Sequence, residues 1–391
     1  MRVLNVHSNM DPVWGGGTAE RTRQTCLALA ALPQAEATLL TLDLGLTPEW
    51  RREMTGVEVV AVPCANRRFQ LPWAAPSRMR QLIERVDVIH LLGHWTLLNA
   101  LVARQARILG KPYVVCPAGA LSIVGRSRRL KRLYNRCFGN RLLRRAARHI
   151  LISTNELPHL DQYGIDRGRA VLIPNGVRPE DFRFRDDVWL RRRFGLGERP
   201  FVLFVGRLNS IKGPDLIVEA FARLGESFPQ HELVLAGPDE GMAVQLRELA
   251  RRLGIGDSVR FLGFVAGEEK SALYHAAELL AIPSRQEAMS IVVLEGGACG
   301  TPVVFTDQCG LEELSDLGAG VVVPATTAGL ERGLRAMLGD PGGSRAMGER
   351  LRALVLERYS WDAIVARFVA VLREVLAEGR TPRAAGDLRG G

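Results

Sequence analysis

Short apolar runs recur along the chain, and most are separated by stretches in which apolar residues have helical spacing. In the first half these runs are 3–7, 37–42, 57–62, 86–91, 113–116, 149–152 and 170–173. The pattern restarts with runs at 200–206, 232–236, 259–262, 279–282, 303–306 and 320–323. Repeated strand-then-helix units build a parallel sheet covered by helices on both faces. The predicted fold class is therefore α/β, with two doubly wound, Rossmann-like domains that face a central cleft.

The two domains are expected to join near residues 175–199, where apolar residues are few and charges cluster. The predicted N-terminal domain is 1–185 and the predicted C-terminal domain is 186–360. Two helices, 328–357 and 361–378, are expected to close the fold, and the second is expected to cross back to the N-terminal domain. The Gly/Arg/Ala-rich end, 379–391, is predicted to be disordered. Ligands are expected at the carboxyl ends of the strands.

The composition, 47% hydrophobic and 24% charged over 391 residues, is ordinary for globular chains. No apolar run approaches the roughly 20 residues of a membrane span, and the start resembles a strand more than a signal peptide. The protein is therefore expected in the cytoplasm. The six cysteines lack paired metal-ligand spacing, so reduced thiols and no metal site are predicted.

The net charge of +10 is distributed unevenly. Residues 1–185 hold 28 Lys and Arg against 14 Asp and Glu, whereas 186–391 hold 24 against 28. Much of the excess lies in residues 126–148, the basic segment, which has ten basic residues and no acidic one. Apolar residues recur there at helical spacing, namely Leu130, Leu133, Tyr134, Cys137 and Phe138. An amphipathic helix with a cationic face is predicted, suited to an anionic membrane surface at the inner face of the cell membrane.

Two other interpretations of the basic segment are an ordinary solvated helix and nucleic-acid binding. No recognised nucleic-acid motif or aromatic interleaving accompanies the charge, so a nucleic-acid partner is not predicted.

Glu287 and Glu295 stand with seven residues between them, on either side of a predicted helix start at Ser290. Glu287 then lies in a loop at a helix N-terminus, where free amides and the helix dipole favour an anion such as a diphosphate. Glu295 lies about 7–8 Å further along the helix, roughly the reach from a diphosphate to its ribose. One carboxylate is predicted to hold the sugar and the other the ribose. The alternative is two solvated surface glutamates.

Arg207 and Lys212 belong to the loop after the first predicted strand of the second half, and Pro214 is placed to begin the next helix. Both cations are placed to meet one diphosphate. The chain has no Asp-x-Asp pair to hold a divalent cation, so a metal-independent mechanism is predicted. Two solvated basic residues beside a turn are the alternative.

Glycines 15, 16 and 17 follow the first strand and precede a helix expected to open near Thr18. Gly15, Gly16 and Gly17 would let the backbone approach an anionic ligand closely, although a flexible turn is the alternative. Two further strand ends, at Gly237 and at Phe264-Val265, are candidates to present backbone groups to a nucleotide base. A core role for Phe264 is equally compatible with the sequence.

From Phe201 to Val304 these motifs occur in the order found in the retaining glycosyltransferases of the GT-B fold, family 4, and the chain resembles that family over nearly its whole length. The resemblance implies a nucleotide-sugar donor and no metal or other cofactor. It implies that Arg207, Lys212 and Glu287 are the catalytic groups and that Glu295 holds the ribose. The residues implied to surround the transferred sugar are Glu287, Ala288, Met289, Ser290 and Ile291. The first-domain glycines resemble a loop that closes over the donor phosphates.

The first domain departs from the family pattern where the acceptor is expected. Relatives often carry histidine where this chain has Leu92 and Ala118, and alanine cannot hydrogen-bond a sugar. The residues predicted with acceptor or sugar are His94, Ala118 and Gly119. A core or solvated histidine is the alternative for His94. Ala288, where relatives often carry glycine, is a smaller departure.

The predicted activity is metal-independent, retaining transfer of a sugar to a glycan or lipid-linked acceptor, in the synthesis of cell-surface polysaccharide or glycolipid. No second carboxylate is placed to pair with Glu287 as a retaining hydrolase requires. Alternatives on the same scaffold are a sugar-nucleotide epimerase, a sugar phosphorylase, and a non-catalytic, membrane-docked nucleotide-binding protein. Fold resemblance does not decide among them.

Overall fold

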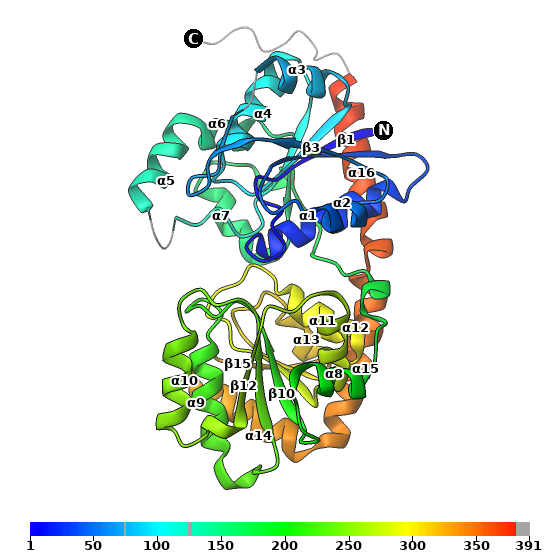
Figure 1. The fold of residues 1–391 in the computed structure, drawn as a ribbon. Helices are drawn as coiled ribbons and strands as arrows, with labels where there is room; N and C mark the ends of the chain where they lie inside the picture. The colour runs from blue at the N-terminus through cyan, green and yellow to red at the C-terminus, as the bar shows by residue number, and fades with distance from the viewer. Residues whose placement is uncertain (74–75, 124–126, 381–391) are drawn as a thin grey trace. The chain divides into compact units, whose positions relative to one another are not determined.

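The computed structural model describes residues 1–73, 76–123 and 127–380, arranged as two compact units. The first unit is Met1–Pro174 together with the chain from Ile364, and the second is Asn175–Ala363. In Figure 1 helices lie on both sides of the sheet in each unit. Arg126 of the basic segment and residues 381–391 of the predicted disordered end lie outside the described residues.

The first unit is built on a seven-stranded parallel sheet with strand order β3-β2-β1-β6-β7-β8-β9. The strands are β1 Arg2–Val6, β2 Glu36–Leu42, β3 Val57–Val62, β6 Val88–Leu92, β7 Tyr113–Cys116, β8 Arg148–Leu151 and β9 Ala170–Leu172. A short antiparallel pair, β4 Cys64–Asn66 and β5 Leu71–Pro72, stands apart. The central strands are buried from end to end, as expected for a sheet covered on both faces.

The helices of the first unit pack against both faces of this sheet (Figure 1). They are α1 Gly16–Ala30, α2 Pro48–Glu53, α3 Pro76–Glu84, α4 Leu97–Ile108, α5 Arg128–Tyr134, α6 Asn140–Arg145, α7 Leu157–Asp161 and most of α16 Trp361–Arg380. A π-helix, η1 Asn135–Gly139, joins α5 to α6 without a break.

The second unit repeats the design with a six-stranded parallel sheet of order β12-β11-β10-β13-β14-β15. Its strands are β10 Phe201–Val205, β11 Glu232–Ala236, β12 Val259–Gly263, β13 Leu279–Ile282, β14 Val303–Thr306 and β15 Val321–Val323. Its helices are α8 Asp187–Phe194, α9 Pro214–Leu224, α10 Ala243–Arg252, α11 Gly267–Ala276, α12 Ile291–Cys299, α13 Glu313–Asp316, α14 Thr327–Gly339 and α15 Pro341–Arg358.

The predicted α/β class with two doubly wound sheets is confirmed, and each predicted strand is present within one or two residues of its expected ends. The single helix expected over 328–357 is wrong, because the chain breaks there into α14 and α15. Pro341 has no N–H to continue a helix, and the Asp340 side chain accepts from the Gly343 N–H at 2.9 Å to cap a new one.

The glycine run after β1 also differs from the expectation. Helix α1 begins at Gly16 rather than near Thr18, so Gly16 and Gly17 form its first turn and Gly15 is its N-cap. The Gly15 N–H donates to the Asp11 carbonyl at 2.7 Å, and a side chain at position 15 would collide with this carbonyl and with Ala19. The turn is therefore tight rather than open.

Each sheet has one point where the strand order reverses direction. In the first unit it lies between β1 and β6, and in the second between β10 and β13. Loops leaving the carboxyl ends of two such strands diverge to opposite faces, and ligands of doubly wound proteins bind in the crevice that opens between them. These two switch points are where the functional residues are expected.

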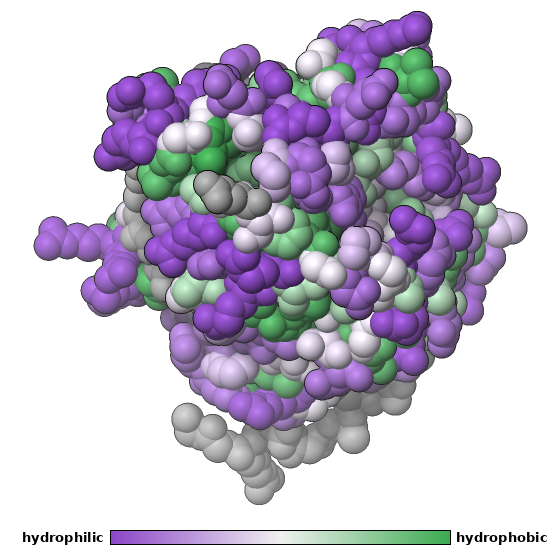
Figure 2. All heavy atoms as spheres, turned by 90° about the horizontal axis from the view of Figure 1, so that it is seen from below, coloured by the Kyte–Doolittle hydropathy of each residue, from purple (hydrophilic) through white to green (hydrophobic). Residues whose placement is uncertain are grey.

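The surface drawn in Figure 2 is mostly hydrophilic, with hydrophobic side chains in small separate groups. Among the described residues, no helix is both long enough and apolar enough to cross a membrane.

Candidate functional site

The loop after β10 carries Lys212 to the switch point of the second unit. Gly213 has φ +66°, and a side chain on it would collide with the Pro283 carbonyl of the loop after β13. The two loops therefore touch through backbone at a position that only glycine fits. Lys212 is fixed just before this contact, where its N–H donates to Asn209 Oδ1 at 2.9 Å.

Lys212 and Glu287 meet across the switch point. Lys212 Nζ lies 2.9 Å from Glu287 Oε1, and the Ser284 hydroxyl donates to the same oxygen. The Glu287 side chain is only 10% exposed and that of Lys212 is 22% exposed, so the pair is more strongly coupled than a surface ion pair. The arrangement offers a cation and a carboxylate side by side at the end of two strands.

Arg285 and Asp215 form a second link between the same loops, which the sequence motifs do not indicate. Arg285 forms a bidentate ion pair with Asp215 at 2.8 and 2.6 Å, and its guanidinium also donates to the Ser210 carbonyl at 2.9 Å. Its own N–H donates to the Ile211 carbonyl at 2.7 Å. Arg285 therefore clamps the Lys212 loop to the Glu287 loop. Arg285 lies two positions from Glu287, and Asp215 follows a helix-starting proline, but the residues alone do not indicate that they pair.

Arg207 belongs to the same loop as Lys212 and is held by a different partner. Its Nη1 lies 2.8 Å from Glu240 Oε1, and Asn209 Nδ2 donates to the other oxygen of Glu240 at 2.6 Å. Glu240 follows β11, so the pairing links the loops after two adjacent strands. Arg207 remains 36% exposed, which leaves part of the guanidinium open to an anion. Glu240 is a further residue that the sequence motifs did not indicate.

The residues after Glu287 lead into α12, which begins at Ile291 with Ser290 as N-cap, as predicted. The Glu287 and Ser290 N–H groups donate to the Gln308 and Cys309 carbonyls, both at 2.9 Å, so a neighbouring loop holds this segment from behind. The Ser290 hydroxyl is buried and has no hydrogen-bond partner among the described residues. It makes no side-chain cap, contrary to the expected capping role.

Met289 and Ala288 attach this segment to neighbouring parts of the second unit. Met289 is buried, and its carbonyl accepts from Asn175 Nδ2 at 3.0 Å. A side chain on Gly310 would collide with the Ala288 carbonyl, so the backbones of these loops are also in contact. The segment from Ala288 to Ser290 is thereby fixed in place before any ligand arrives.

Glu295 lies in the middle of α12, eight residues after Glu287, and is 4% exposed. Its two carboxylate oxygens accept from Lys270 Nζ at 2.8 Å and from the Tyr274 hydroxyl at 2.6 Å. Burial, and then the charge of Glu295, hold the pKa of Tyr274 well above its ordinary value, so the hydroxyl stays protonated and donates. Each carboxylate oxygen has a second acceptor position, so hydrogen bonding to a ribose remains chemically open. The solvated-glutamate alternative does not fit this burial.

The strand ends proposed to contact a base differ from each other. A side chain on Gly237 would collide with the Gly206 carbonyl, and the Gly237 N–H donates to the Gly263 carbonyl at 2.7 Å. Gly237 therefore allows the loops after β10, β11 and β12 to pack. Phe264 is 43% exposed, whereas Val265 is 5% exposed. Phe264 is thus a surface side chain and not the core residue that was the alternative.

The switch point of the first unit is closed by neutral polar contacts. His94 is fully buried, and its Nε2 lies 2.8 Å from Asn135 Oδ1 in η1. Burial lowers the pKa of His94 to about 4, so the ring is neutral at pH 7. Gly139 of the same π-helix packs so closely that a side chain there would reach within 2.9 Å of the ring. The π-helix therefore holds His94 in place.

Ala118 and Gly119 form the turn after β7, and both have positive φ, 50° and 81°. Glycine tolerates this region and alanine does so only with strain. The Gly119 N–H donates to Glu156 Oε1 at 2.6 Å, and the Ile152 N–H donates to the other oxygen at 2.7 Å. Glu156 is 2% exposed, and burial raises its pKa. This buried carboxylate, absent from the predicted site, fixes the turn.

Of the predicted residues, the structure brings together Lys212, Glu287 and the start of α12, with Arg207 on the same loop as Lys212. Gly15 to Gly17, His94, Ala118 and Gly119 belong to the other unit, and their assignment to donor or acceptor remains a prediction.

Two family models match the chain. The one described as "Glycosyl transferase 4-like domain" matches residues 16–176, and the one described as "Glycosyl transferases group 1" matches residues 190–354. Curated relatives include the D-inositol 3-phosphate glycosyltransferase of Salinispora tropica, 37% identical over 239 residues, which are 57% of this chain and 49% of the relative. That of Acidothermus cellulolyticus is 35% identical over 234 residues, 57% of this chain and 52% of the relative. The chain thus matches about half the length of these relatives.

Similar solved structures include Anabaena HepE in complex with UDP-glucose, with a TM-score of 0.78 at 21% identity over 96% of this chain and 100% of the other. The sucrose-phosphate synthase of Thermosynechococcus elongatus has a TM-score of 0.74 at 22% identity, over 97% and 100% of the two chains. WaaG, a glycosyltransferase involved in lipopolysaccharide biosynthesis, has a TM-score of 0.69 at 20% identity, over 94% and 99%. At these identities the likeness shows the fold.

Proposed function

Because the chain belongs to the group 1 glycosyl transferases with the GT-B fold, we propose that it moves a sugar from a nucleotide-sugar donor to a glycan or lipid-linked acceptor, with the anomeric configuration retained. The contact between Lys212 and Glu287 carries this proposal. It places a cation for the diphosphate beside a carboxylate for sugar hydroxyls, at the switch point where doubly wound folds bind ligands.

The second unit would hold the donor. Lys212 and the exposed part of Arg207 would bind the diphosphate, because cations at that position stabilise the charge that develops on the leaving group. The amides at the start of α12 would add hydrogen bonds to phosphate or sugar. Glu287, held by Lys212 and Ser284, would orient the sugar, and Glu295 would accept from the ribose hydroxyls.

The proposed reaction would use these groups as follows. The acceptor hydroxyl would attack the anomeric carbon from the face that the nucleoside diphosphate leaves, and the leaving phosphate would take the proton. Positioning and charge stabilisation would then supply the catalysis, without a covalent nucleophile. The cationic side chains would do the work that a divalent metal does in other transferases, so no metal would be required.

We propose that the first unit supplies the acceptor side, and that the basic segment docks it reversibly on the inner face of the cell membrane. Support comes from exposed apolar residues among the arginines: Leu130 is 51% exposed, Leu133 56% and Phe138 47%. Basic residues with exposed apolar ones are typical of helices that lie in a membrane interface. An acceptor used in cell-surface polysaccharide or glycolipid synthesis would be met there.

The test is a survey of nucleotide sugars with a membrane fraction as acceptor source. We expect a new glycoside product with the anomeric configuration of the donor by NMR, and no loss of activity with EDTA. A product that requires inorganic phosphate would indicate a phosphorylase, and a product from donor alone an epimerase. Binding of a nucleotide sugar without any product across the survey would contradict the proposed activity.

A further inference from the structure

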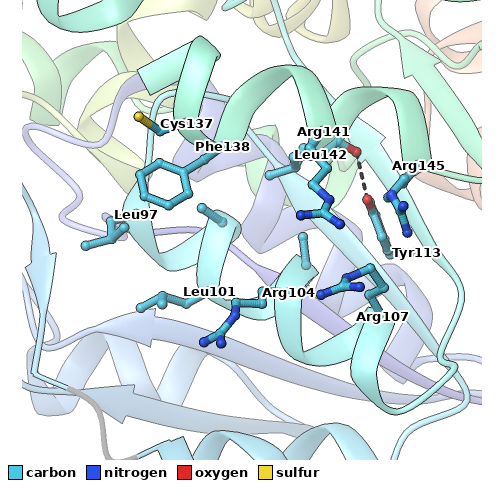
Figure 3. A pocket seen from close by; sticks show the side chains of 12 residues that line it. Leu97, Leu101, Arg104, Arg107, Tyr113, Cys137, Phe138, Arg141, Leu142 and Arg145 are labelled. Atoms are coloured by element: carbon cyan, nitrogen blue, oxygen red, sulfur yellow. Dashed lines mark hydrogen bonds between the residues drawn. The ribbon is translucent and has the colours of Figure 1, made fainter. Parts of the chain in front are cut away.

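A groove on the first unit lies outside the candidate site. It has a volume of about 230 Å³ and runs between α4 and the helical segment formed by η1 and α6 (Figure 3). The residues that line this basic groove are Leu97, Ala100, Leu101, Ala103, Arg104, Arg107, Tyr113, Cys137, Phe138, Arg141, Leu142 and Arg145. The lining therefore includes four arginines and no carboxylate.

The four arginines form two pairs, one on each wall. Arg104 and Arg107 are three residues apart on α4, and Arg141 and Arg145 are four apart on α6, so each pair shares a helix face. All four are exposed, and none makes an ion pair or hydrogen bond within the described part of the chain. Like charges at such spacing destabilise a helix slightly, and facing pairs add to the repulsion. An anion between the walls would relieve it.

The two ends of the basic groove differ in chemistry. Leu97, Leu101 and Phe138 supply apolar side chains at one end, and Figure 3 shows Arg104 beside Leu101 and the other three arginines towards the opposite end. Tyr113 closes the cationic end, where its hydroxyl donates to the Leu142 carbonyl at 2.7 Å. A ligand that matches this division has an anionic group joined to an apolar part.

The volume limits the ligand further. Pockets that enclose a drug-sized molecule measure roughly 300–1,000 Å³, so 230 Å³ suits a headgroup and not a whole nucleotide sugar or lipid. Phe138 lines the groove and is itself 47% exposed, which places an apolar side chain at the opening. A nucleic-acid backbone would instead require a charged track that continues beyond the groove, with stacking platforms for bases.

We propose that the basic groove binds the phosphate headgroup of an anionic phospholipid, with the adjoining glycerol and first acyl carbons against Leu101 and Phe138. The inference rests on the membrane-docking part of the proposed function and makes it more specific. General attraction needs only charge density, whereas this groove selects a phosphate attached to an apolar chain. Arg104 and Arg107, which lie outside the basic segment, become part of the membrane contact.

Cys137 provides a direct probe, because it is exposed and lines the groove. The experiment measures alkylation of Cys137 by neutral N-ethylmaleimide, followed on its peptide by mass spectrometry, with no donor or acceptor present. The ligands are dihexanoyl-phosphatidylglycerol below its micelle concentration, dihexanoyl-phosphatidylcholine, inorganic phosphate and a short oligonucleotide. At ten times its dissociation constant the anionic lipid should slow alkylation about tenfold. The phosphatidylcholine, the phosphate and the oligonucleotide should each have little effect.

Matched variants separate the groove from the rest of the cationic surface. Arg104→Gln/Arg141→Gln should abolish protection, whereas Arg128→Gln/Arg129→Gln on α5 removes the same charge and should retain it. All four side chains are exposed, so both variants should keep the wild-type melting temperature. Equal loss of Cys137 protection in both variants would indicate general electrostatic attraction of the lipid to the basic surface and would contradict binding in the groove. Equal protection by inorganic phosphate or by the oligonucleotide would also overturn the proposal. A lack of glycosyl transfer alone would leave this result unchanged and would count only against the proposed activity.

Discussion

The two sheets of this protein have the same design but different chemistry at their switch points. In the second unit, charged side chains meet at the ends of β10 and β13, with Lys212 on Glu287 and Arg207 on Glu240. In the first unit, His7 follows β1, His90 lies within β6 and His94 follows β6, and all three are buried. Doubly wound folds bind ligands at such switch points, and the side chains decide what each can bind.

The polar side chains at the two switch points also differ in their charge at pH 7. Burial lowers the pKa of His7 and His94 to about 4 and that of His90 well below its ordinary value, so these rings are neutral hydrogen-bonding groups at pH 7. Such groups suit uncharged hydroxyls. The cations of the second unit remain partly exposed and suit a diphosphate. Diphosphate binding at a switch point is therefore expected of the second unit only.

The largest expected effect is acid sensitivity confined to the first unit. Besides His7 and His94, His149 is buried there with a pKa lowered to about 4. As the pH falls from 6.5 towards 4, the unfolded chain binds protons that the folded unit excludes, so stability falls with pH. At pH 5.0 each of the three costs about 2 kcal/mol, a large share of the 5–15 kcal/mol that holds a domain together.

Limited proteolysis at pH 7.5 and 5.0, with cleavage sites identified by mass spectrometry, would measure this effect. Cleavage at pH 5.0 should begin in the first unit, and His149→Leu should recover part of the loss. The second unit serves as the internal control, since its His275, whose pKa burial also lowers, is only half-buried. Simultaneous cleavage of both units at pH 5.0 would contradict the greater acid sensitivity expected of the first unit.

The next effect is on turnover. Lys212→Ala should lower kcat at least about a hundredfold, since one oxyanion donor typically contributes 2.7–4 kcal/mol to the transition state. The melting temperature should change little because Lys212 is partly exposed. Arg251→Ala is a matched control, because Arg251 pairs with Glu248 on the exposed face of α10. Wild-type turnover in the Lys212 variant would contradict the role of Lys212 in stabilising the charge of the leaving group.

A smaller effect concerns stability at the first unit's turn. Glu156→Ala leaves the buried N–H of Ile152 and the partly buried N–H of Gly119 without an acceptor, at about 1–3 kcal/mol for a buried donor. Glu287→Ala should cost less than this, because Lys212 is partly exposed and can turn to water, and only the Ser284 hydroxyl loses its acceptor. Urea denaturation with proteolysis as the readout gives both values. A larger loss for the Glu287 variant would reverse the assigned roles.

The smallest effect separates the two glutamates of the second unit. Glu295→Gln should weaken nucleoside diphosphate binding about tenfold, the value of one good hydrogen bond to a charged group. Glu287→Gln should leave that affinity nearly unchanged and lower turnover, since a nucleoside diphosphate has no transferred sugar. Calorimetry of both variants is the measurement. A greater loss of affinity in the Glu287 variant would exchange the two roles.

The sequence predicts the parallel sheets well, because buried strands are continuous apolar runs whose ends are marked by glycine or proline. Runs such as 279–282 and 303–306 correspond to β13 and β14 without adjustment. The spacing of Lys212 and Glu287 from their strands was enough to place both at one edge. Helix breaks were harder, since the helical periodicity of 328–357 continues through Pro341 even though the backbone cannot.

Contacts between loops were not predictable in the same way. Arg285 pairs with Asp215, and Arg207 with Glu240, only because strands of the same sheet end at the same edge and bring together loops that are distant in sequence. The π-helix that sets Asn135 against His94 likewise depends on one extra residue in a turn, which periodicity does not reveal. These contacts hold the loops of the second unit together and orient the His94 ring of the first unit, whereas burial is what lowers the pKa of that ring.

We proposed that the switch point of the second unit binds a diphosphate through its cations. Calorimetric titration of the wild-type protein, Lys212→Gln and Arg207→Gln with a series of nucleoside diphosphates and the matching monophosphates tests it most directly. Wild-type protein should bind one diphosphate more tightly than its monophosphate, and Lys212→Gln should weaken that binding at least about tenfold, or 1.4 kcal/mol. Equal affinity of wild-type protein and both variants for every diphosphate would contradict the account.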